Sequence, residues 1–176
     1  MHPTIKRALA AGFFISLWLL GGFSILKSLS LPVPQSDLRT ITGLLGLVIL
    51  FTGIMYGIRK AKTDRKEDNF SYARAIKTGI LISVIVAIIV SLASLLYVTV
   101  INPGFTNDMV RETELSLEKS GATPAEMAKK LSRARNEFSV TGQFISGLIV
   151  QSAAGTLFSL VLGLFYRTKS TKNKLP

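Results

Sequence analysis

Residues 79–101 read GILISVIVAIIVSLASLLYVTVI and contain no charged side chain. At a rise of about 1.5 Å per residue, a helix of this length exceeds the roughly 30 Å hydrocarbon core of a bilayer. Backbone amides inside a bilayer have to be satisfied within the segment, so this stretch is predicted to be a transmembrane α-helix. Three further segments are equally free of charge: residues 8–26, 40–58 and 141–166. The sequence therefore predicts an all-α membrane protein, a single domain over residues 1–176 with four transmembrane helices.

The composition of the chain supports this class and excludes others. Of the 176 residues, 48% are hydrophobic and only 18% are charged, whereas about a quarter are charged in soluble domains. There is no cysteine, and His2 is the single histidine, so disulfide scaffolds and transition-metal sites built from these ligands are excluded. We therefore expect no metal and no cofactor.

The distribution of Lys and Arg predicts the orientation in the membrane. Thirteen of the 21 basic residues lie before residue 8, within 59–78 or after residue 166. Basic residues next to membrane spans mark the cytoplasmic side, so the protein is predicted to be multi-pass with both termini cytoplasmic. This topology also accounts for the net charge of +11, so lipid and not nucleic acid is the expected partner. The candidates for contact with anionic headgroups on the cytoplasmic face are Arg59, Lys60, Lys62, Arg65, Lys66, Arg167 and Lys169.

Residues 59–78 are predicted to form a basic cytoplasmic loop. Within it, Phe70, Ala73 and Ile76 recur at every third residue, which is compatible with a short amphipathic helix in the membrane interface. Two interpretations stay open: a solvated loop of the usual positive-inside kind, or an interfacial helix that recruits lipid or a cytoplasmic partner.

Residues 102–140 form the largest segment outside the predicted spans. Residues 102–104 (NPG) end the third span, because proline lacks a backbone donor and disfavours helix in the residue before it. Thr106 or Asn107 can cap a first helix, which Gly121 terminates.

A second helix is predicted to follow directly. Thr123, Pro124 and Glu126 match a capping box with proline at the first helical position. Residues at i, i+4, i+7 and i+11 then form one apolar stripe. These residues are Met127, Leu131, Ala134 and Phe138. The segment is predicted to be an extracytoplasmic helical hairpin whose stripe packs within the protein, on lipid or on a partner.

Small residues recur at intervals of four in two of the predicted spans. Such spacing lets transmembrane helices approach closely, and a glutamine among the small residues can form a hydrogen bond across the interface. The helix-packing candidates are Gly53, Gly57, Gly147, Gln151, Gly155, Ser159 and Gly163. Two interpretations stay open: packing within the four-helix bundle, or association with a second copy or a membrane-protein partner.

The residue inventory does not favour catalysis. The carboxylates all lie outside the predicted spans, no glycine-rich phosphate loop is present, and the serines inside spans have no companion base. We expect no catalytic residue and no enzymatic activity. The hypothesis is a small integral inner-membrane protein with a structural or protein-interaction role. The alternative is an oligomeric small transporter or channel component that uses polar groups such as Gln151, Thr52 and Ser94.

Three stretches carry a family resemblance: GIRK at 57–60, NFSYARAIKTG at 69–79 and INPGF at 101–105. Together they resemble domain-of-unknown-function family 4199, a family of bacterial membrane proteins found mainly in Bacteroidetes, over most of the chain. The sequence departs from the family pattern in Gly104, where an acidic residue is expected, and in its unusually basic connector. The resemblance implies a four-span inner-membrane protein and implies no activity, cofactor or catalytic residue.

Overall fold

The computed structural model describes residues 3–28, 35–64 and 70–168, and these ranges contain helices and no strand. One of the elements is a short π-helix that continues a longer α-helix. In chain order the elements are α1 (Pro3–Ser28), α2 (Gln35–Asp64), α3 (Tyr72–Leu96), η1 (Tyr97–Ile101), α4 (Phe105–Lys119), α5 (Pro124–Phe138) and α6 (Val140–Tyr166).

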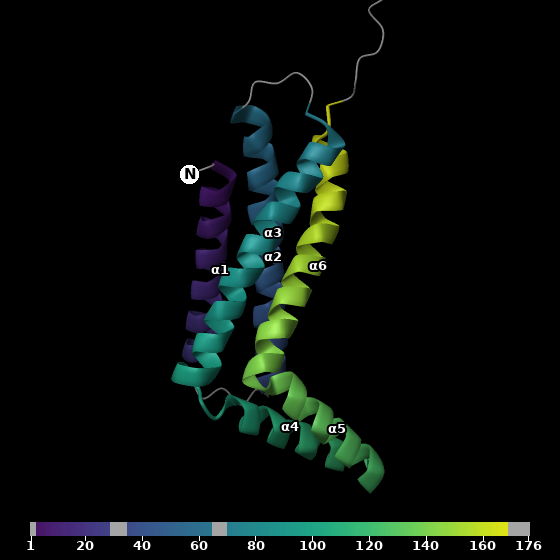
Figure 1. Cartoon of the computed structure of the whole chain (residues 1–176). Helices are drawn as coiled ribbons and strands as arrows, with labels where there is room; N and C mark the ends of the chain where they lie inside the picture. Colours follow the sequence, from purple (N-terminus) through teal and green to yellow (C-terminus); the bar gives the residue numbers. More distant parts are fainter. Residues whose placement is uncertain (1–2, 29–34, 65–69, 169–176) are drawn as a thin grey trace, which may run out of the picture.

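Four of these helices are long and apolar enough to cross a membrane, which confirms the prediction of four membrane-spanning helices at this level. The stretches that qualify are Pro3–Gly22, Thr40–Thr63, Tyr72–Ile101 and Val140–Tyr166. The helices α1, α2, α3 and α6 lie together as an elongated bundle, and α4 and α5 lie beside each other at one end of it (Figure 1). Every helix of the bundle extends beyond the charge-free segment from which it was predicted.

Helices take up much of the segment 59–78, and its residues 65–69 lie outside the described residues. The helix α2 continues through Lys60 to Asp64, and α3 begins at Tyr72 with Ser71 as its cap, so the described part contains no separate interfacial helix. The spacing of Phe70, Ala73 and Ile76 does not mark a separate helix, because Ile76 belongs to α3 itself. Phe70 is 1% exposed and packs in the bundle core, where its carbonyl accepts a hydrogen bond from the backbone of Thr168.

Helix α3 lies at the centre of the bundle and packs against α6, α1 and α2. Its inner positions are buried and belong to one apolar core. That core includes Ile54 and Leu50 of α2, Ile15 of α1 and Leu162 of α6. The most extensive of these interfaces is the one between α3 and α6.

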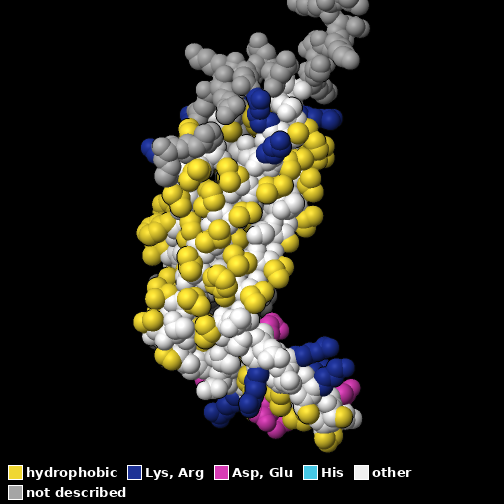
Figure 2. Space-filling view, viewed as in Figure 1, with side chains coloured by type: hydrophobic (Ala, Val, Ile, Leu, Met, Phe, Trp, Pro, Cys, Tyr) yellow, Lys and Arg dark blue, Asp and Glu magenta, His cyan; other side chains and the backbone are white. Residues whose placement is uncertain are grey.

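The outer faces of the bundle are apolar, as expected of helices that meet lipid. Figure 2 shows hydrophobic side chains along the length of the bundle, with Lys and Arg gathered at its two ends. Phe13 and Leu157 are each about three-fifths exposed, at 62% and 63%. Trp18, which lies near the middle of α1, is also exposed.

Candidate functional site

The small residues of α6 lie on the face that meets α3. Gly155, Ser159 and Gly163 are buried, and a Cβ added at Gly155 would overlap the side chain of Ser83 on α3. Gly79 of α3 is placed in the same way against Ser159. Small residues of each helix therefore lie against small residues of the other, and this lets the two backbones approach closely.

The serine hydroxyls of this interface bond mainly within their own helices. Ser83 Oγ donates to the carbonyl of Gly79 at 2.7 Å, and Ser159 Oγ donates to the carbonyl of Gly155 at 2.6 Å. A serine that bonds back in this way presents a small, satisfied surface to the neighbouring helix.

The other glycine candidates have different neighbours. Gly53 of α2 faces Ala11 of α1, with 3.2 Å from a built Cβ to the Ala11 Cβ, and Gly57 lies against Ile82 of α3. Gly147 is near Ser91 of α3. The glycine candidates and Ser159 thus lie in three different interfaces, between α1 and α2, α2 and α3, and α3 and α6.

Three buried polar atoms of the bundle have no hydrogen-bond partner within the described residues. They are Ser16 Oγ, Ser91 Oγ and Gln151 Oε1, and they come from α1, α3 and α6. Thr52 and Ser94, named with Gln151 as possible lining groups, instead donate to the carbonyls four residues before them, at 2.8 and 3.0 Å. Their hydroxyls therefore add little polarity to any path through the bundle.

The pair formed by α4 and α5, here called the α4–α5 pair, is attached to the bundle through an aromatic cluster. Phe105 of α4 makes edge contacts with Tyr97 and with Phe138 of α5, at ring-centroid distances of 5.9 and 6.3 Å. Met109 and Ala134 complete the buried cluster, which sits at the end of α3. Tyr97 is buried here, where Phe105 of α4 packs against its ring.

The start of α4 differs from the prediction. The helix begins at Phe105 with no side-chain cap, and Thr106 instead donates its hydroxyl to the carbonyl of Phe138 at 2.7 Å. The π-helical turn before it, in which the backbone N–H of Asn102 donates to the carbonyl of Tyr97 at 2.7 Å, was also missed. A single π turn leaves no periodic signal in the sequence. Phe105, the aromatic residue directly after the NPG motif, was a usable sign of the aromatic cluster.

The second helix begins as predicted. Thr123 accepts a hydrogen bond from the backbone of Glu126, Glu126 bonds back to Thr123, and Pro124 occupies the first helical position, which confirms the capping box. Gly121 has a φ of 68°, a conformation that glycine adopts readily, so it ends the preceding turn as predicted. Along the apolar stripe, the two residues nearer the bundle, Ala134 and Phe138, are buried, whereas Met127 and Leu131 are half-buried.

Comparison with protein families now adds to this geometry. Residues 4–168 match the model of the family described as Protein of unknown function (DUF4199). The chain belongs to this family. The match confirms the resemblance carried by the three sequence stretches. No curated protein and no solved structure matches the chain.

In this DUF4199 protein, the basic candidates that are described lie at one end of the bundle. Arg59, Lys60 and Arg167 are exposed, whereas Lys62 is half-buried and donates from Nζ to the carbonyl of Tyr166 at 3.1 Å. A cation at that position satisfies a carbonyl at the C-terminal end of α6. Arg65, Lys66 and Lys169 lie outside the described residues.

The described residues of this DUF4199 protein contain no group of three or more His, Asp or Glu side chains placed to hold a metal ion. The described arrangement is instead one of helix-packing surfaces, a basic end of the bundle and a charged pair of helices.

Proposed function

We propose that this is a small, non-enzymatic integral protein of the bacterial inner membrane with a structural or protein-interaction role. Both termini are cytoplasmic, and the α4–α5 pair is an extracytoplasmic helical hairpin that docks another membrane protein. The observation that carries the proposal is the attachment of the α4–α5 pair, which is anchored by one end and extends beyond the side of the bundle (Figure 1).

The exposed faces of the α4–α5 pair have the character of a polar docking surface. Leu117 is buried, and Met127 and Leu131 are half-buried, so the apolar groups are largely used where the two helices meet. The exposed remainder is rich in charges of both signs (Figure 2). These exposed groups are Asp108, Arg111, Glu114, Glu118, Lys119, Glu126, Lys129, Lys130, Arg133, Arg135 and Glu137. Mixed charges of this kind favour recognition of a partner through electrostatic complementarity.

The small residues at the α3–α6 interface do not favour a docking role for this face. Gly155 and Ser159 are already occupied by α3 of the same chain, which supports packing within the bundle over association with a second copy. A partner therefore has to bind elsewhere, and the α4–α5 pair is the largest element outside the spans.

The alternative is an oligomeric small transporter or channel component. The observation in its favour is the burial of three unpartnered polar atoms on α1, α3 and α6, because polar groups in the hydrocarbon are costly unless they are satisfied or serve a path. These three polar groups are uncharged, and they come from one chain. A path for solute would therefore require a rearrangement of the helices or several copies of the chain.

The topology is tested by reporter fusions. An alkaline-phosphatase-type reporter fused after Gly121 is expected to be active outside the cytoplasm, and one fused after Lys66 is expected to be inactive. Activity at both sites, or only after Lys66, would contradict the proposed orientation.

The docking role is tested by charge reversal on the α4–α5 pair. Lys129→Glu with Arg133→Glu is expected to remove a stoichiometric partner that co-purifies with the wild-type chain in mild detergent, because both side chains are exposed on α5. Lys77→Glu, a reversal at an exposed position of α3, is the matched control and is expected to retain the partner. A lone oligomer that transports solute in liposomes would instead support the transporter alternative.

A further inference from the structure

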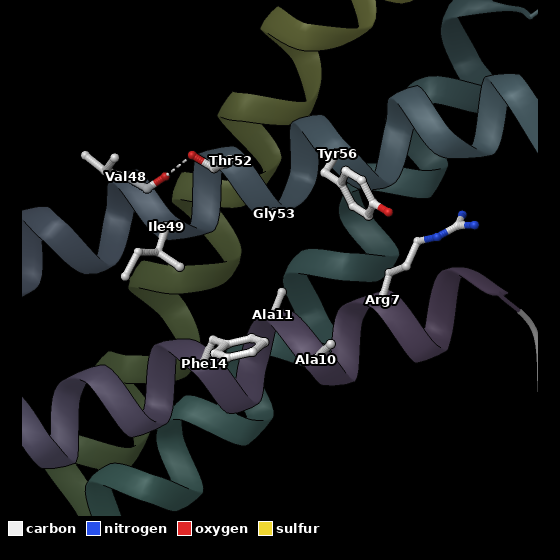
Figure 3. A pocket seen from close by; sticks show the side chains of 9 residues that line it. All are labelled: Arg7, Ala10, Ala11, Phe14, Val48, Ile49, Thr52, Gly53 and Tyr56. Atoms are coloured by element: carbon white, nitrogen blue, oxygen red, sulfur yellow. Dashed lines mark hydrogen bonds between the residues drawn. The ribbon is translucent and has the colours of Figure 1, made fainter.

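A recess lies between α1 and α2, where the packing of these two helices leaves a groove. This groove has a volume of about 500 Å³, within the range of small-molecule sites. Figure 3 shows its lining residues, which come from both helices. They are Arg7, Ala10, Ala11 and Phe14 of α1 with Val48, Ile49, Thr52, Gly53 and Tyr56 of α2.

Most of the groove is apolar and open to the outside of the bundle. Its floor is formed by small residues, where Ala11 meets Gly53, and Phe14 and Val48 are about three-fifths exposed along its sides. Thr52 adds no free hydroxyl donor, because its Oγ1 donates to the carbonyl of Val48 at 2.8 Å. Since α1 and α2 are both long and apolar enough to cross a membrane, this open side faces hydrocarbon.

One end of the groove is polar and positive. Arg7 and Tyr56 lie together at the end nearest the start of α1 (Figure 3). Tyr56 also lines an adjacent depression of about 210 Å³ together with Arg59, Lys60 and Thr63. The apolar groove therefore leads directly into a site with three basic side chains.

We propose that this groove binds one anionic phospholipid, with an acyl chain along the apolar floor and its phosphate beside Arg7 and Lys60. An arginine guanidinium can hold a phosphate by two parallel hydrogen bonds, and a tyrosine hydroxyl at headgroup level can donate a third. In the proposed orientation this end lies at the cytoplasmic leaflet, whose surface is rich in anionic lipid. The site requires only that α1 and α2 span the bilayer, and it does not depend on docking at the α4–α5 pair.

The chemistry of the groove favours a lipid over a helix from a second copy. A phospholipid supplies an apolar chain for the floor and an anion for the basic end that Arg7 and Lys60 help to form. A charge-free transmembrane helix would supply no anion at that end.

The test is native mass spectrometry of the full chain in mild detergent, titrated with phosphatidylglycerol or with phosphatidylcholine of the same acyl chains. The wild type is expected to retain one phosphatidylglycerol and to bind phosphatidylcholine more weakly. Arg7→Gln and Lys60→Gln are each expected to weaken phosphatidylglycerol binding about fivefold. Ala10→Phe, at an exposed position in the groove, is expected to abolish the binding of both lipids by filling the space for the chain.

Two matched controls separate the groove from general effects. Lys77→Gln removes an exposed charge outside the groove, and Ala153→Phe adds the same bulk at an exposed position on α6. Both are expected to bind phosphatidylglycerol as the wild type does, and thermal unfolding of each lipid-free variant verifies that it is folded. Equal binding of the two lipids by the wild type, or binding that Ala10→Phe leaves unchanged, would overturn the proposal. A dimer that Ala10→Phe dissociates would show that a second copy fills the groove and would also overturn it.

Discussion

The α3–α6 interface and the base of the α4–α5 pair are held together by different means. Between α3 and α6 the contacts are made by glycine and serine, with Gly155 against Ser83 and Gly79 against Ser159. At the base of the pair they are made by large side chains such as Phe105 and Phe138. Lipid tails are as apolar as leucine, so helices inside a bilayer gain from close approach of their backbones. Outside the spans, burying aromatic surface away from water gives the larger gain.

The largest expected effect tests the aromatic base. Phe105→Ala removes a ring that is 3% exposed and contacts both Tyr97 and Phe138. Phenylalanine-to-alanine changes at such sites cost about 3–5 kcal/mol in free energy of unfolding. Limited proteolysis is expected to show new cleavage within 105–138 while the bundle stays resistant. Leu115→Ala, at a side chain that is 48% exposed on the same helix, is the control and is expected to change little.

A smaller effect is expected in the membrane interface. Gly155→Leu places a large side chain where even a Cβ would overlap Ser83, so α3 and α6 have to separate. Overpacking of this kind costs about 1–3 kcal/mol and is expected to lower the thermal unfolding temperature in detergent. Gly43→Leu, at a position with nothing within 4 Å of a built Cβ, is expected to leave that temperature nearly unchanged. Equal loss in both variants would mean that close packing at Gly155 is not what stabilises the bundle.

The start of α5 gives the third effect. Thr123→Ala removes the hydroxyl that accepts from the backbone of Glu126, and loss of such a cap costs about 1 kcal/mol. Hydrogen exchange is expected to accelerate in the first turn of α5 and to stay unchanged in α6. Thr123→Ser keeps the hydroxyl and is expected to restore slow exchange. Faster exchange in α6 as well would show that the α4–α5 pair and the bundle are coupled. It would contradict the view that the two regions are stabilised separately.

The smallest effect is a pH dependence at the same cap. Hydrogen bonds from the backbone and the side chain of Thr123 lower the pKa of Glu126 below its ordinary value of 4.5. The charged form is thus favoured in the folded chain, so its contribution to stability is present above pH 4.5 and is lost as the pH falls through the lowered pKa. The protection of the first turn of α5, taken relative to the intrinsic exchange rate at each pH, is expected to fall over that acidic range. Glu126→Gln is expected to remove this dependence, and an unchanged pH profile in that variant would contradict the assignment.

Local signals in the sequence predicted much of this molecule correctly. The charge-free runs indicated four spanning helices, and Thr123, Pro124 and Glu126 located the start of α5, because capping depends on residues within one turn. Signals that depend on distant partners failed. Thr106 was expected to cap α4 but bonds to Phe138, which is 32 residues away. Phe70 was placed in a cytoplasmic segment read either as a solvated loop or as an interfacial helix, although it packs in the core next to the end of α6.

The sequence by itself determined the class of the protein and the number of helices long enough to span a membrane, because the length of an uncharged segment is a local property. Only the tertiary structure decided which small residues meet and which face of each helix stays open. The small residues of α6 face α3. The groove that combines Arg7 with Tyr56 exists only because α1 and α2 lie together. A helix in lipid can be apolar on every side, so its sequence has no polar face to mark the outside, and the contacts among helices have to be seen in three dimensions.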